Sequence, residues 1–406
     1  MGKMAIRAAR VFDGGRMLDG PAVVLVDGPL ILDVLPGSTV PEGWPVRELA
    51  DGTLSPGLID AHVHLCADSG PGALDRLARQ SEEQVNDAIE AALAVHLAAG
   101  VTTVRDLGDQ RDAVLAWRAG AGAGAGSGAG AEAGADLPTV VASGTPITSV
   151  GGHCWSMGGE VRGESEIREA VRRRAERGAD VVKIMASGGV LTPGTDTFSP
   201  QFTAGELKAA AEEAHALGLP ITAHAHALTA VRQALQAGLD GIEHCTCLTP
   251  DGIRIDDDLL AALAGAGTAV CATLGSDPGV FVPPEVRAMA ERAGITEAIL
   301  QQGVARLHRG GVRVVAGSDG GIGPAKPHGL LPATLAEYVT SGLSATAALT
   351  AATSVAADVC GLGERKGRIR PGYDADLLEV EGDPTRDITT LARPRAVHLA
   401  GRLVTG

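Results

Sequence analysis

The sequence predicts a (β/α)8 barrel, or TIM barrel, joined to a small β-sandwich domain that both ends of the chain build. Three observations lead to this fold class. Between residues 58 and 319, eight short apolar runs alternate with helical stretches, which is the pattern of strands and helices in such a barrel. Several of these helices end at a glycine, a common C-cap residue. Strand-like runs separated by turn residues stand before and after this region.

The β domain is predicted from short apolar runs that turn residues interrupt. Asp-Gly pairs at residues 13–14 and 27–28 separate the first three runs, as in a β-meander. A similar pattern returns near the C-terminus, so we expect the two ends to pair. The runs are residues 5–12, 22–26, 30–35, 375–380 and 396–404. The β-sandwich domain therefore comprises residues 1–54 and 366–406, and residues 55–365 form the barrel.

Strands and helices follow one another in order through the predicted barrel. The strands are residues 58–65, 101–106, 137–142, 179–185, 220–226, 241–245, 268–273 and 312–319. The helices are residues 82–99, 111–118, 167–177, 204–217, 228–236, 259–264 and 297–309. An open, doubly wound sheet is the alternative architecture, but no glycine-rich phosphate loop follows the first strand.

Residues 119–135 fit neither a strand nor a helix. Ala and Gly alternate there almost without interruption, apart from Ser127 and Glu132. Glycine at this density cannot hold a helix, so we expect a flexible surface insertion between the second helix and the third strand. The insertion is not expected to take part in chemistry.

Composition and charge limit the kinds of partner. The chain has 406 residues, of which 45% are hydrophobic and 20% charged, enough for a catalytic domain and a smaller one. Its net charge of −15 argues against nucleic acid or an anionic membrane as a partner, because both attract clusters of Lys and Arg. A small-molecule substrate is expected instead. The sequence leaves the oligomeric state open, a homo-oligomer included.

The cysteines and the N-terminus indicate a cytoplasmic protein. Six cysteines occur without CxxC spacing and within apolar segments, so they are expected to be reduced thiols. The first residues lack the apolar core of a signal peptide, and no uncharged apolar run reaches the length of a membrane span.

The first barrel strand carries His62 and His64. Side chains two residues apart on a strand point the same way, so both imidazoles face one point and could bind a metal ion. Asp60 precedes them, where its carboxylate could orient an imidazole. The alternative is a half-buried strand whose histidines pair with their neighbours, since so short a motif also occurs without a metal.

Further polar residues stand at the ends of the other predicted strands, where a barrel builds its active site. Lys183 lies in the apolar run 181–185, where an amine is costly unless its charge is removed or paired. A buried lysine that reacts with CO2 becomes a carbamate, an anion that could bridge two cations. The strand-end residues are His62, His64, Arg105, Asp106, Lys183, His224, His226, His244 and Asp319.

These residues stand in recognisable motifs. The motifs are GLIDAHVH at residues 57–64, TTVRD at 102–106, VKIMASGG at 182–189, AHAH at 223–226, IEH at 242–244, GSD at 317–319 and KGRIRPGYDADL at 366–377. As a set they resemble the amidohydrolase superfamily, in particular its imidazolonepropionase-like and Xaa-Pro dipeptidase-like branch. The resemblance covers nearly the whole chain.

The resemblance implies a site for two divalent metal ions, with zinc as the expected ion. Imidazole and carboxylate ligands suit Zn²⁺, and two neighbouring cations can share and deprotonate a water. The implied reaction is hydrolysis of an amide or another carbon–nitrogen bond by a metal-bridged hydroxide, with Asp319 as general acid and base. The implied ligands are His62, His64 and Asp319 on one metal, His224 and His244 on the other, and a carboxylated Lys183 as the bridge.

Several substrates and two other functions stay open at this point. An N-acyl amino acid, a dipeptide, an arylamide or a phenylurea would each suit the implied reaction. A mononuclear deaminase or cyclic-amide hydrolase would bind one metal and would not need a modified lysine, and Lys183 argues against it. A non-catalytic relative would be expected to have lost metal ligands, whereas this chain retains all six.

His226 stands two residues after His224 and faces the same mouth. The family pattern places the metal ligand at the first of the two positions, so we assign His224 to metal and His226 to the substrate pocket. The dipeptidase branch usually has Tyr at the second position and Arg three residues later, where this chain has His226 and Thr229. This departure bears on how a substrate carboxylate would be recognised.

The loop after the third strand is rich in glycine yet carries His153, Trp155 and Met157. Its resemblance to the family's histidine-bearing third loop implies that His153 hydrogen-bonds the substrate carbonyl or its oxyanion, so His153 counts as both catalytic and substrate-binding. Trp155 is expected to line the pocket, and Met157 is counted with it. The alternative is a surface loop with an incidental histidine.

Overall fold

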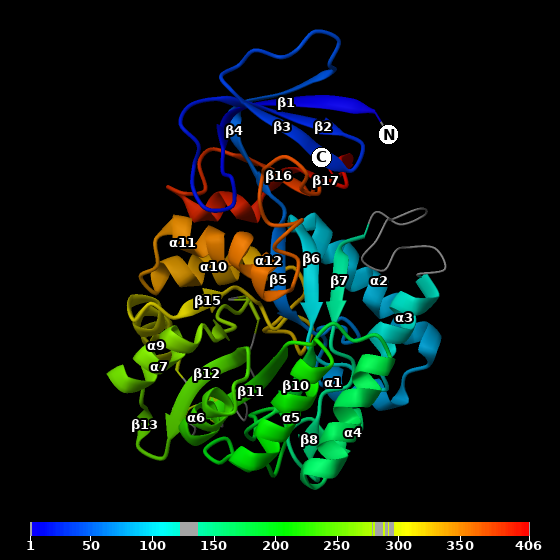
Figure 1. The fold of residues 1–406 in the computed structure, drawn as a ribbon, viewed down its shortest axis with the longest axis vertical. Helices are drawn as coiled ribbons and strands as arrows, with labels where there is room; N and C mark the ends of the chain where they lie inside the picture. The colour runs from blue at the N-terminus through cyan, green and yellow to red at the C-terminus, as the bar shows by residue number, and fades with distance from the viewer. Residues whose placement is uncertain are drawn as a thin grey trace.

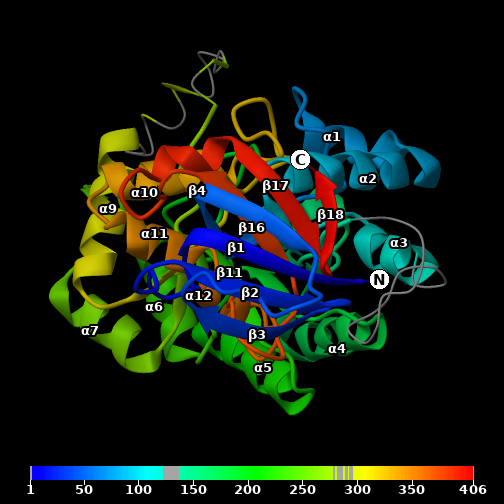
Figure 2. The same cartoon turned by 90° about the horizontal axis from the view of Figure 1, so that it is seen from above.

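The computed structural model describes residues 2–121, 137–277, 279–280, 287–288, 291 and 296–405. A β domain that contains both chain ends lies over one end of a barrel (Figure 1). Seen from above, the terminal strands cross that end, with helices around them (Figure 2). Strands β6 and β7 point away from the β domain in Figure 1, so the carboxyl ends of the barrel strands lie at the far end.

The predicted (β/α)8 barrel is confirmed. Neighbouring strands pair in parallel within two sheets. Backbone hydrogen bonds close the barrel between the sheets: Ala61 N–H donates to the carbonyl of Ala316 at 3.0 Å, and Ile147 N–H to that of Lys183 at 2.8 Å. The barrel strands are β5 (Leu58–Val63), β6 (Val101–Asp106), β7 (Thr139–Ala142), β10 (Val182–Met185), β11 (Ile221–Ala227), β12 (Gly241–Thr249), β14 (Ala269–Cys271) and β15 (Arg313–Val315).

Helices between the strands cover the barrel. Ser81 and Thr203 start two of them, each with a capping box that the fourth residue completes. Ile89, Leu93 and Leu97 recur every four residues on one helix face and are buried in the core. The longer helices between the barrel strands are α2 (Glu82–Ala98), α3 (Ala113–Ala121), α4 (Gly163–Glu176), α5 (Ala204–Ala216), α6 (Leu228–Gln236), α7 (Asp257–Ala266) and α9 (Glu297–Arg309).

Three helices after the last barrel strand were not predicted. They are α10 (Leu331–Thr340), α11 (Ala345–Ala351) and α12 (Ser354–Val359). The Tyr338 hydroxyl of α10 donates to the carbonyl of Val315 at 3.0 Å, so this segment packs against the barrel. The smaller elements between strands are α1 (Ala73–Arg76), β8 (Thr148–Ser149), β9 (Glu160–Val161) and β13 (Gly252–Ile253).

The terminal strands form the predicted β domain as one continuous seven-stranded sheet. Strand β4 was not predicted; it pairs with β1 from the N-terminus and with β16 from the C-terminus. It then continues into β5 through Gly57, where an added Cβ would lie 2.2 Å from Thr102 Oγ1. The division at residues 54 and 366 stays a prediction. The strands are β1 (Lys3–Val11), β2 (Ala22–Asp27), β3 (Leu30–Pro36), β4 (Val46–Pro56), β16 (Leu377–Glu381), β17 (Pro394–Leu399) and β18 (Arg402–Thr405).

Other predictions meet the structure as follows. All six cysteines are buried and carry free thiols. Most of the predicted Ala/Gly insertion, residues 122–135, lies outside the described residues, and α3 includes residues 119–121. Among the helices that the structure describes, none is long and apolar enough to cross a membrane.

Candidate metal centre

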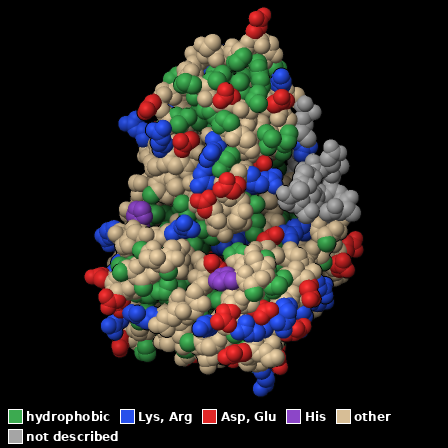
Figure 3. All heavy atoms as spheres, in the orientation of Figure 1, with side chains coloured by type: hydrophobic (Ala, Val, Ile, Leu, Met, Phe, Trp, Pro, Cys, Tyr) green, Lys and Arg blue, Asp and Glu red, His purple; other side chains and the backbone are tan. Residues whose placement is uncertain are grey.

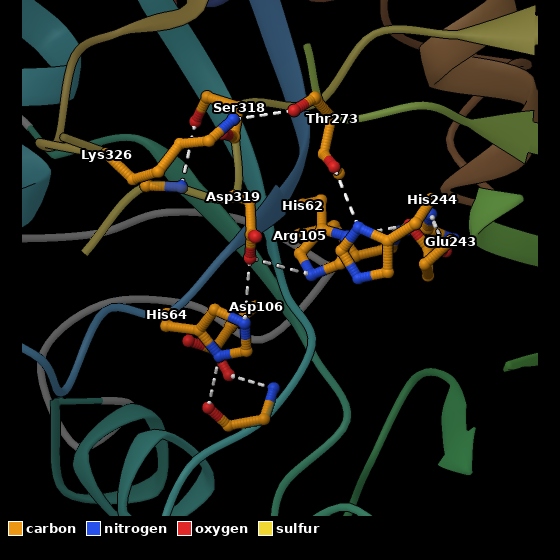
Figure 4. Close-up of polar contacts among 12 residues, drawn as sticks. His62, His64, Arg105, Asp106, Glu243, His244, Thr273, Ser318, Asp319 and Lys326 are labelled. Atoms are coloured by element: carbon orange, nitrogen blue, oxygen red, sulfur yellow. Dashed lines mark hydrogen bonds and ion pairs between the residues drawn. The ribbon is translucent and has the colours of Figure 1, made fainter. Parts of the chain in front are cut away.

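His62 and His64 meet Asp319 where the first and last barrel strands join. The Nε2 atoms of both histidines lie 3.3 Å from the same oxygen, Oδ1 of Asp319. All three residues are buried and point toward one another (Figure 4). Two imidazole nitrogens and a carboxylate oxygen in this arrangement suit one divalent metal ion.

Backbone hydrogen bonds hold this first group in place. Asp319 N–H donates to the carbonyl of His62 at 2.8 Å, and His64 N–H donates to that of Gly320 at 2.8 Å. Asp319 has a φ of 60°, a left-handed conformation that non-glycine residues seldom adopt. Such backbone persists where surrounding contacts fix it, as at many functional sites.

Asp60 does not hydrogen-bond the imidazole of His62 or of His64, so the expectation that it orients one of them was wrong; its Oδ2 lies 4.0 Å from Nδ1 of His96 instead. Its Oδ1 accepts from the backbone N–H of Ser318 at 2.9 Å and from that of His62 at 3.3 Å. Its Oδ2 accepts from the Ser318 hydroxyl at 2.6 Å. Asp60 therefore joins β5 to the segment that carries Asp319. Burial raises the pKa of Asp60 to about 6, although these hydrogen bonds act to lower it.

His224, His226 and His244 form a second group on β11 and β12. Their ring centroids lie 4.7 Å apart in each pair, and one ring nitrogen of each lies within 4.8 Å of the other two. His62 links the two groups, because its ring centroid is 5.4 Å from that of His64 and 5.5 Å from that of His244. The histidines predicted from the strand ends therefore converge.

Hydrogen bonds to carbonyl or carboxylate oxygens fix the tautomers of three histidines. His62 Nδ1–H donates to Glu243 Oε2 at 2.8 Å. His64 Nδ1–H donates to the carbonyl of Gly108, also at 2.8 Å. In the neutral form of each ring, Nε2 is thereby left without a proton. His224 is held the other way, because its Nε2–H faces a backbone carbonyl at 3.3 Å and its Nδ1 is left free. An unprotonated ring nitrogen is the one that binds a metal.

Burial keeps most of these histidines neutral. It lowers the pKa of His62 and of His226 to about 4, and lowers the pKa of His224 and of His244 well below the usual value. Their lone pairs are therefore available near neutral pH. His64 differs, because Asp319 outweighs burial and raises its pKa. The His64–Asp319 contact thus favours a cation, whether a proton or a metal ion.

Glu243 is a site residue that sequence reasoning missed. Its Oε2 accepts from His62, while its Oε1 accepts from the Thr222 hydroxyl at 2.6 Å and from Arg105 Nη2 at 3.2 Å. Burial disfavours its charge, but Arg105 and His62 outweigh burial and hold its pKa well below the usual range. Glu243 is therefore the anion that orients His62. A charged residue inside an apolar strand, next to His244, was the available signal.

We expect Glu243→Gln to weaken metal binding about 10- to 100-fold, the usual effect of losing a partner that orients a ligand. The amide keeps the shape of the side chain but leaves Arg105 without its counter-charge. Titration of the metal-free protein with Zn²⁺ against a chelating dye measures the effect. Glu212→Gln, which changes an exposed pair with Arg168, is the control. Unchanged affinity in Glu243→Gln would contradict the orienting role.

Lys183 lies within β10 and is 2% exposed. Within the part of the chain that the structure describes, its amine forms no hydrogen bond or ion pair. Burial lowers its pKa, while the charges of Glu243 and Asp319 act in the opposite direction. An unpaired buried ammonium is costly, and the neutral amine is the form that adds CO2. Lys183 therefore fits a carbamate, and the whole donor set fits divalent cations.

Arg105 and Asp106, the other predicted strand-end residues, support the site through the backbone. Arg105 Nε–H donates to the carbonyl of Ala61 at 2.8 Å. Asp106 accepts from Leu65 N–H at 2.7 Å and from Gly108 N–H at 3.1 Å. It therefore fixes the loop that carries the acceptor of His64.

His153 reaches the second histidine group from the loop after β7. Its ring centroid is 4.4 Å from that of His224. The Thr192 hydroxyl lies 2.8 Å from its Nδ1. An added Cβ at Gly189 would lie 2.3 Å from the His153 ring, so only glycine lets the loop after β10 approach so closely. The loop after β10 therefore clamps this ring.

Trp155 and Met157 lie in the short helix Trp155–Met157 of the same loop. Trp155 is 49% exposed. Met157 is buried in a small cluster with Cys154 and Met185, so it supports the loop. Contact of either residue with substrate stays a prediction.

A cavity of about 280 Å³ adjoins the second group and is lined by His226, His244, Thr273 and Lys326, among others. Sequence reasoning missed Thr273 and Lys326. The Thr273 hydroxyl lies 2.8 Å from Nδ1 of His244, and Lys326 follows the last barrel strand in a loop. Neither residue stands in a motif, so only the folded chain reveals them.

A barrel with two groups of buried histidines at the carboxyl ends of its strands is typical of metal-dependent hydrolases. The chain belongs to the Amidohydrolase family, whose profile matches residues 53–404. The predicted superfamily is thereby confirmed. A crystal structure of a Xaa-Pro dipeptidase with bound methionine has a TM-score of 0.86 and 26% identity, covering 100% of both chains.

Two curated relatives are similar in sequence. Ochratoxinase of Aspergillus niger is 29% identical over 240 residues, which is 58% of this chain and 48% of the relative. The match thus spans about half the length of that relative. An uncharacterised protein of Mycobacterium bovis is 28% identical over 390 residues, which is 93% of this chain and 90% of the relative.

Proposed function

We propose that the protein is a metal-dependent hydrolase that cleaves an amide or other carbon–nitrogen bond of a small molecule. The observation that carries the proposal is the convergence of two buried histidine groups at one end of the barrel. Beside them lies Lys183, whose amine has no partner among the described residues. The proposed ligands are His62, His64 and Asp319 for one cation, His224 and His244 for the other, and a carbamate on Lys183 between them. Zinc suits these ligands best.

Asp319 would transfer the proton. When bound, the two cations would supply Lewis acidity and lower the pKa of a water at the site. Oδ1 of Asp319 faces His62 and His64 at 3.3 Å, which leaves Oδ2 to take a proton from the attacking water and deliver it to the leaving nitrogen. Burial opposes the charge of Asp319, but the two histidines hold its pKa well below the usual range. It therefore begins the reaction as a carboxylate.

His153 would bind the oxygen of the bond that is cleaved. The Thr192 hydroxyl accepts Cys154 N–H at 3.0 Å, so its own hydrogen is available to His153 Nδ1. The ring proton then stands on Nε2, which lies 3.5 Å from Cys154 Sγ, a weak acceptor that a substrate oxygen would replace. Burial lowers the pKa of His153 to about 3, so it acts as a neutral donor to the developing oxyanion.

Small molecules with an amide bond are the proposed substrates, such as N-acyl amino acids, dipeptides, arylamides and phenylureas. Similarity to a Xaa-Pro dipeptidase and to ochratoxinase supports this class. Basic and acidic side chains are interspersed over the barrel face shown in Figure 3. That neither nucleic acid nor membrane is a partner stays an expectation from the net charge. The cytoplasmic location and the oligomeric state stay predictions.

We expect two zinc ions per chain in protein purified after growth with ample zinc. Elemental analysis against the protein concentration measures this ratio, and hydrolysis of a panel of N-acyl amino acids, dipeptides and arylamides measures activity. One ion per chain, together with deamination or cyclic-amide hydrolysis, would instead favour the mononuclear alternative. Absence of bound metal would contradict the proposal.

Two variants separate the roles of the neighbouring histidines. His224→Ala is expected to lose one ion, whereas His226→Ala is expected to keep both and to change the preference among substrates. The same elemental analysis and panel serve as the measurement. The opposite result would reverse the assignment, because both rings lie in the second histidine group.

A further inference from the structure

The cavity of about 280 Å³ lies beside the proposed reaction centre. His226 and His244 line it, and α9 and α10 contribute to the lining through Leu300 and Glu337. Its volume is at the small end of ligand pockets. A group bound in it would therefore be small and would lie next to the bond that is cleaved.

Lys326 is the one lysine or arginine among the described residues that line this cavity. Its ammonium donates to the carbonyl of Thr273 at 2.6 Å and to that of Ser318 at 3.2 Å. An ammonium has three hydrogens to donate, so one is left for a ligand. Over the described ranges, no carboxylate lies within ion-pair distance of Lys326.

The two carbonyls place Lys326 close to both histidine groups. Thr273, whose carbonyl accepts from Lys326, also hydrogen-bonds His244 through its hydroxyl at 2.8 Å. Ser318, the other acceptor, directly precedes Asp319. Figure 4 shows Lys326 beside Ser318, with Asp319 and Thr273 nearby. Its charge therefore lies near a proposed ligand of each cation.

We propose that Lys326 binds a carboxylate of the substrate and that the adjoining cavity holds the side chain next to that carboxylate. This inference rests on the proposed function and names its substrate class, the N-acyl amino acids, including dipeptides. In these molecules one carbon separates the carboxylate from the nitrogen of the bond that is cleaved. A group that binds this carboxylate must therefore lie near the reaction centre and have a free N–H, and Lys326 has both properties.

The part of the lining that α9 and α10 supply restricts the side chain. Gln301 Nε2 donates to Glu337 at 2.8 Å and to Glu297 at 3.3 Å, and all three residues line the cavity. These two carboxylates would repel a second anion, while Leu274 and Leu300 offer apolar contact. Substrates with one carboxylate and an apolar side chain are therefore favoured over those with an acidic side chain.

Matched substrates test the inference on the zinc-loaded enzyme. N-acetyl-L-leucine and N-acetyl-L-leucinamide share the N-acetyl bond but differ in the carboxylate. For hydrolysis of that bond, we expect the wild type to favour the acid roughly 10- to 100-fold in kcat/KM, the scale of a hydrogen bond to a charged group. Lys326→Met should remove this preference mainly through KM, and Lys326→Arg should restore part of it. Lys208→Met, on an exposed lysine, should behave as wild type.

Two kinetic outcomes would overturn the inference. A wild type with no preference for the acid would do so while leaving the proposed function intact. An equal loss on both substrates in Lys326→Met would mean that Lys326 acts on the centre itself. If the enzyme hydrolyses other amides but neither of these two substrates, a binding measurement tests the inference instead.

Binding is measured with molecules that cannot be hydrolysed. Norleucine and pentylamine differ only by the carboxylate, and neither contains an amide bond. Calorimetry should show tighter binding of norleucine to the wild type and no such difference in Lys326→Met. Equal binding of the two molecules to the wild type would contradict the inference, whether or not any substrate is found.

Discussion

Replacing Lys183 with alanine is expected to remove at least one metal ion and nearly all hydrolytic activity, on the order of 10³-fold or more, as for loss of a preorganised charge at a reaction centre. The buried amine has no partner in the described residues. The charges of Glu243 and Asp319 act on it and raise its pKa, against the effect of burial. A carbamate would use that position to bind both cations. Elemental analysis and turnover measured on the same sample give the two readouts.

Rescue and matched variants make this experiment specific. A short carboxylate such as acetate should partly restore metal and activity in Lys183→Ala, because it can enter the space that the side chain leaves. Lys183→Met fills that space with an apolar chain of similar length, so it should resist rescue. Full metal content in both variants, or a free amine at Lys183 well away from any metal in a crystal structure of the loaded enzyme, would refute the bridge.

Replacing Asp319 with asparagine is expected to lower turnover by roughly 10²-fold or more, the usual scale for general acid–base catalysis. Asparagine keeps an oxygen that can face His62 and His64, but it has no carboxylate to hold a proton. The loss should appear in kcat rather than in KM, because the substrate contacts are unchanged. Steady-state kinetics at matched metal content measures it.

Two controls protect this interpretation. The metal content of Asp319→Asn must be determined, because lost metal alone would lower turnover. Asp374→Asn changes a carboxylate that pairs with Lys366 in the link to the β domain, so its turnover should remain near that of the wild type. An Asp319→Asn enzyme that keeps its metals and its full turnover would assign proton transfer to another group.

The convergence of the candidate ligands was predictable because its signals are local in the sequence. His62 and His64 stand two residues apart, and a strand sends such side chains to one side whatever the rest of the chain does. Lys183 was conspicuous because a lysine within an apolar strand needs a special reason. The structure brings together the histidines and Asp319, and none of the residues that it describes pairs with the amine of Lys183. Binding of metal by these residues stays a proposal.

The barrel was predictable for a related reason. The spacing of apolar residues distinguishes its strands from its helices, and C-cap glycines mark where helices end. The missed elements were those whose burial comes from the assembled fold. Strand β4 is largely exposed at its start and is buried over its last residues, where it pairs with β16. Helices α10 to α12 lie between two motifs and carry neither.

The sequence by itself determined the fold class, the family motifs and the residues with ligand chemistry, because each depends on neighbours in the chain. Only the tertiary structure decided which partner each side chain uses. Glu243 orients His62 across 181 positions, and Asp60 bonds Ser318 across 258. Lys326 likewise reaches Thr273 across 53 positions. Such pairs form because closure of the barrel fixes strand register and brings distant side chains within hydrogen-bond distance, which no local pattern records.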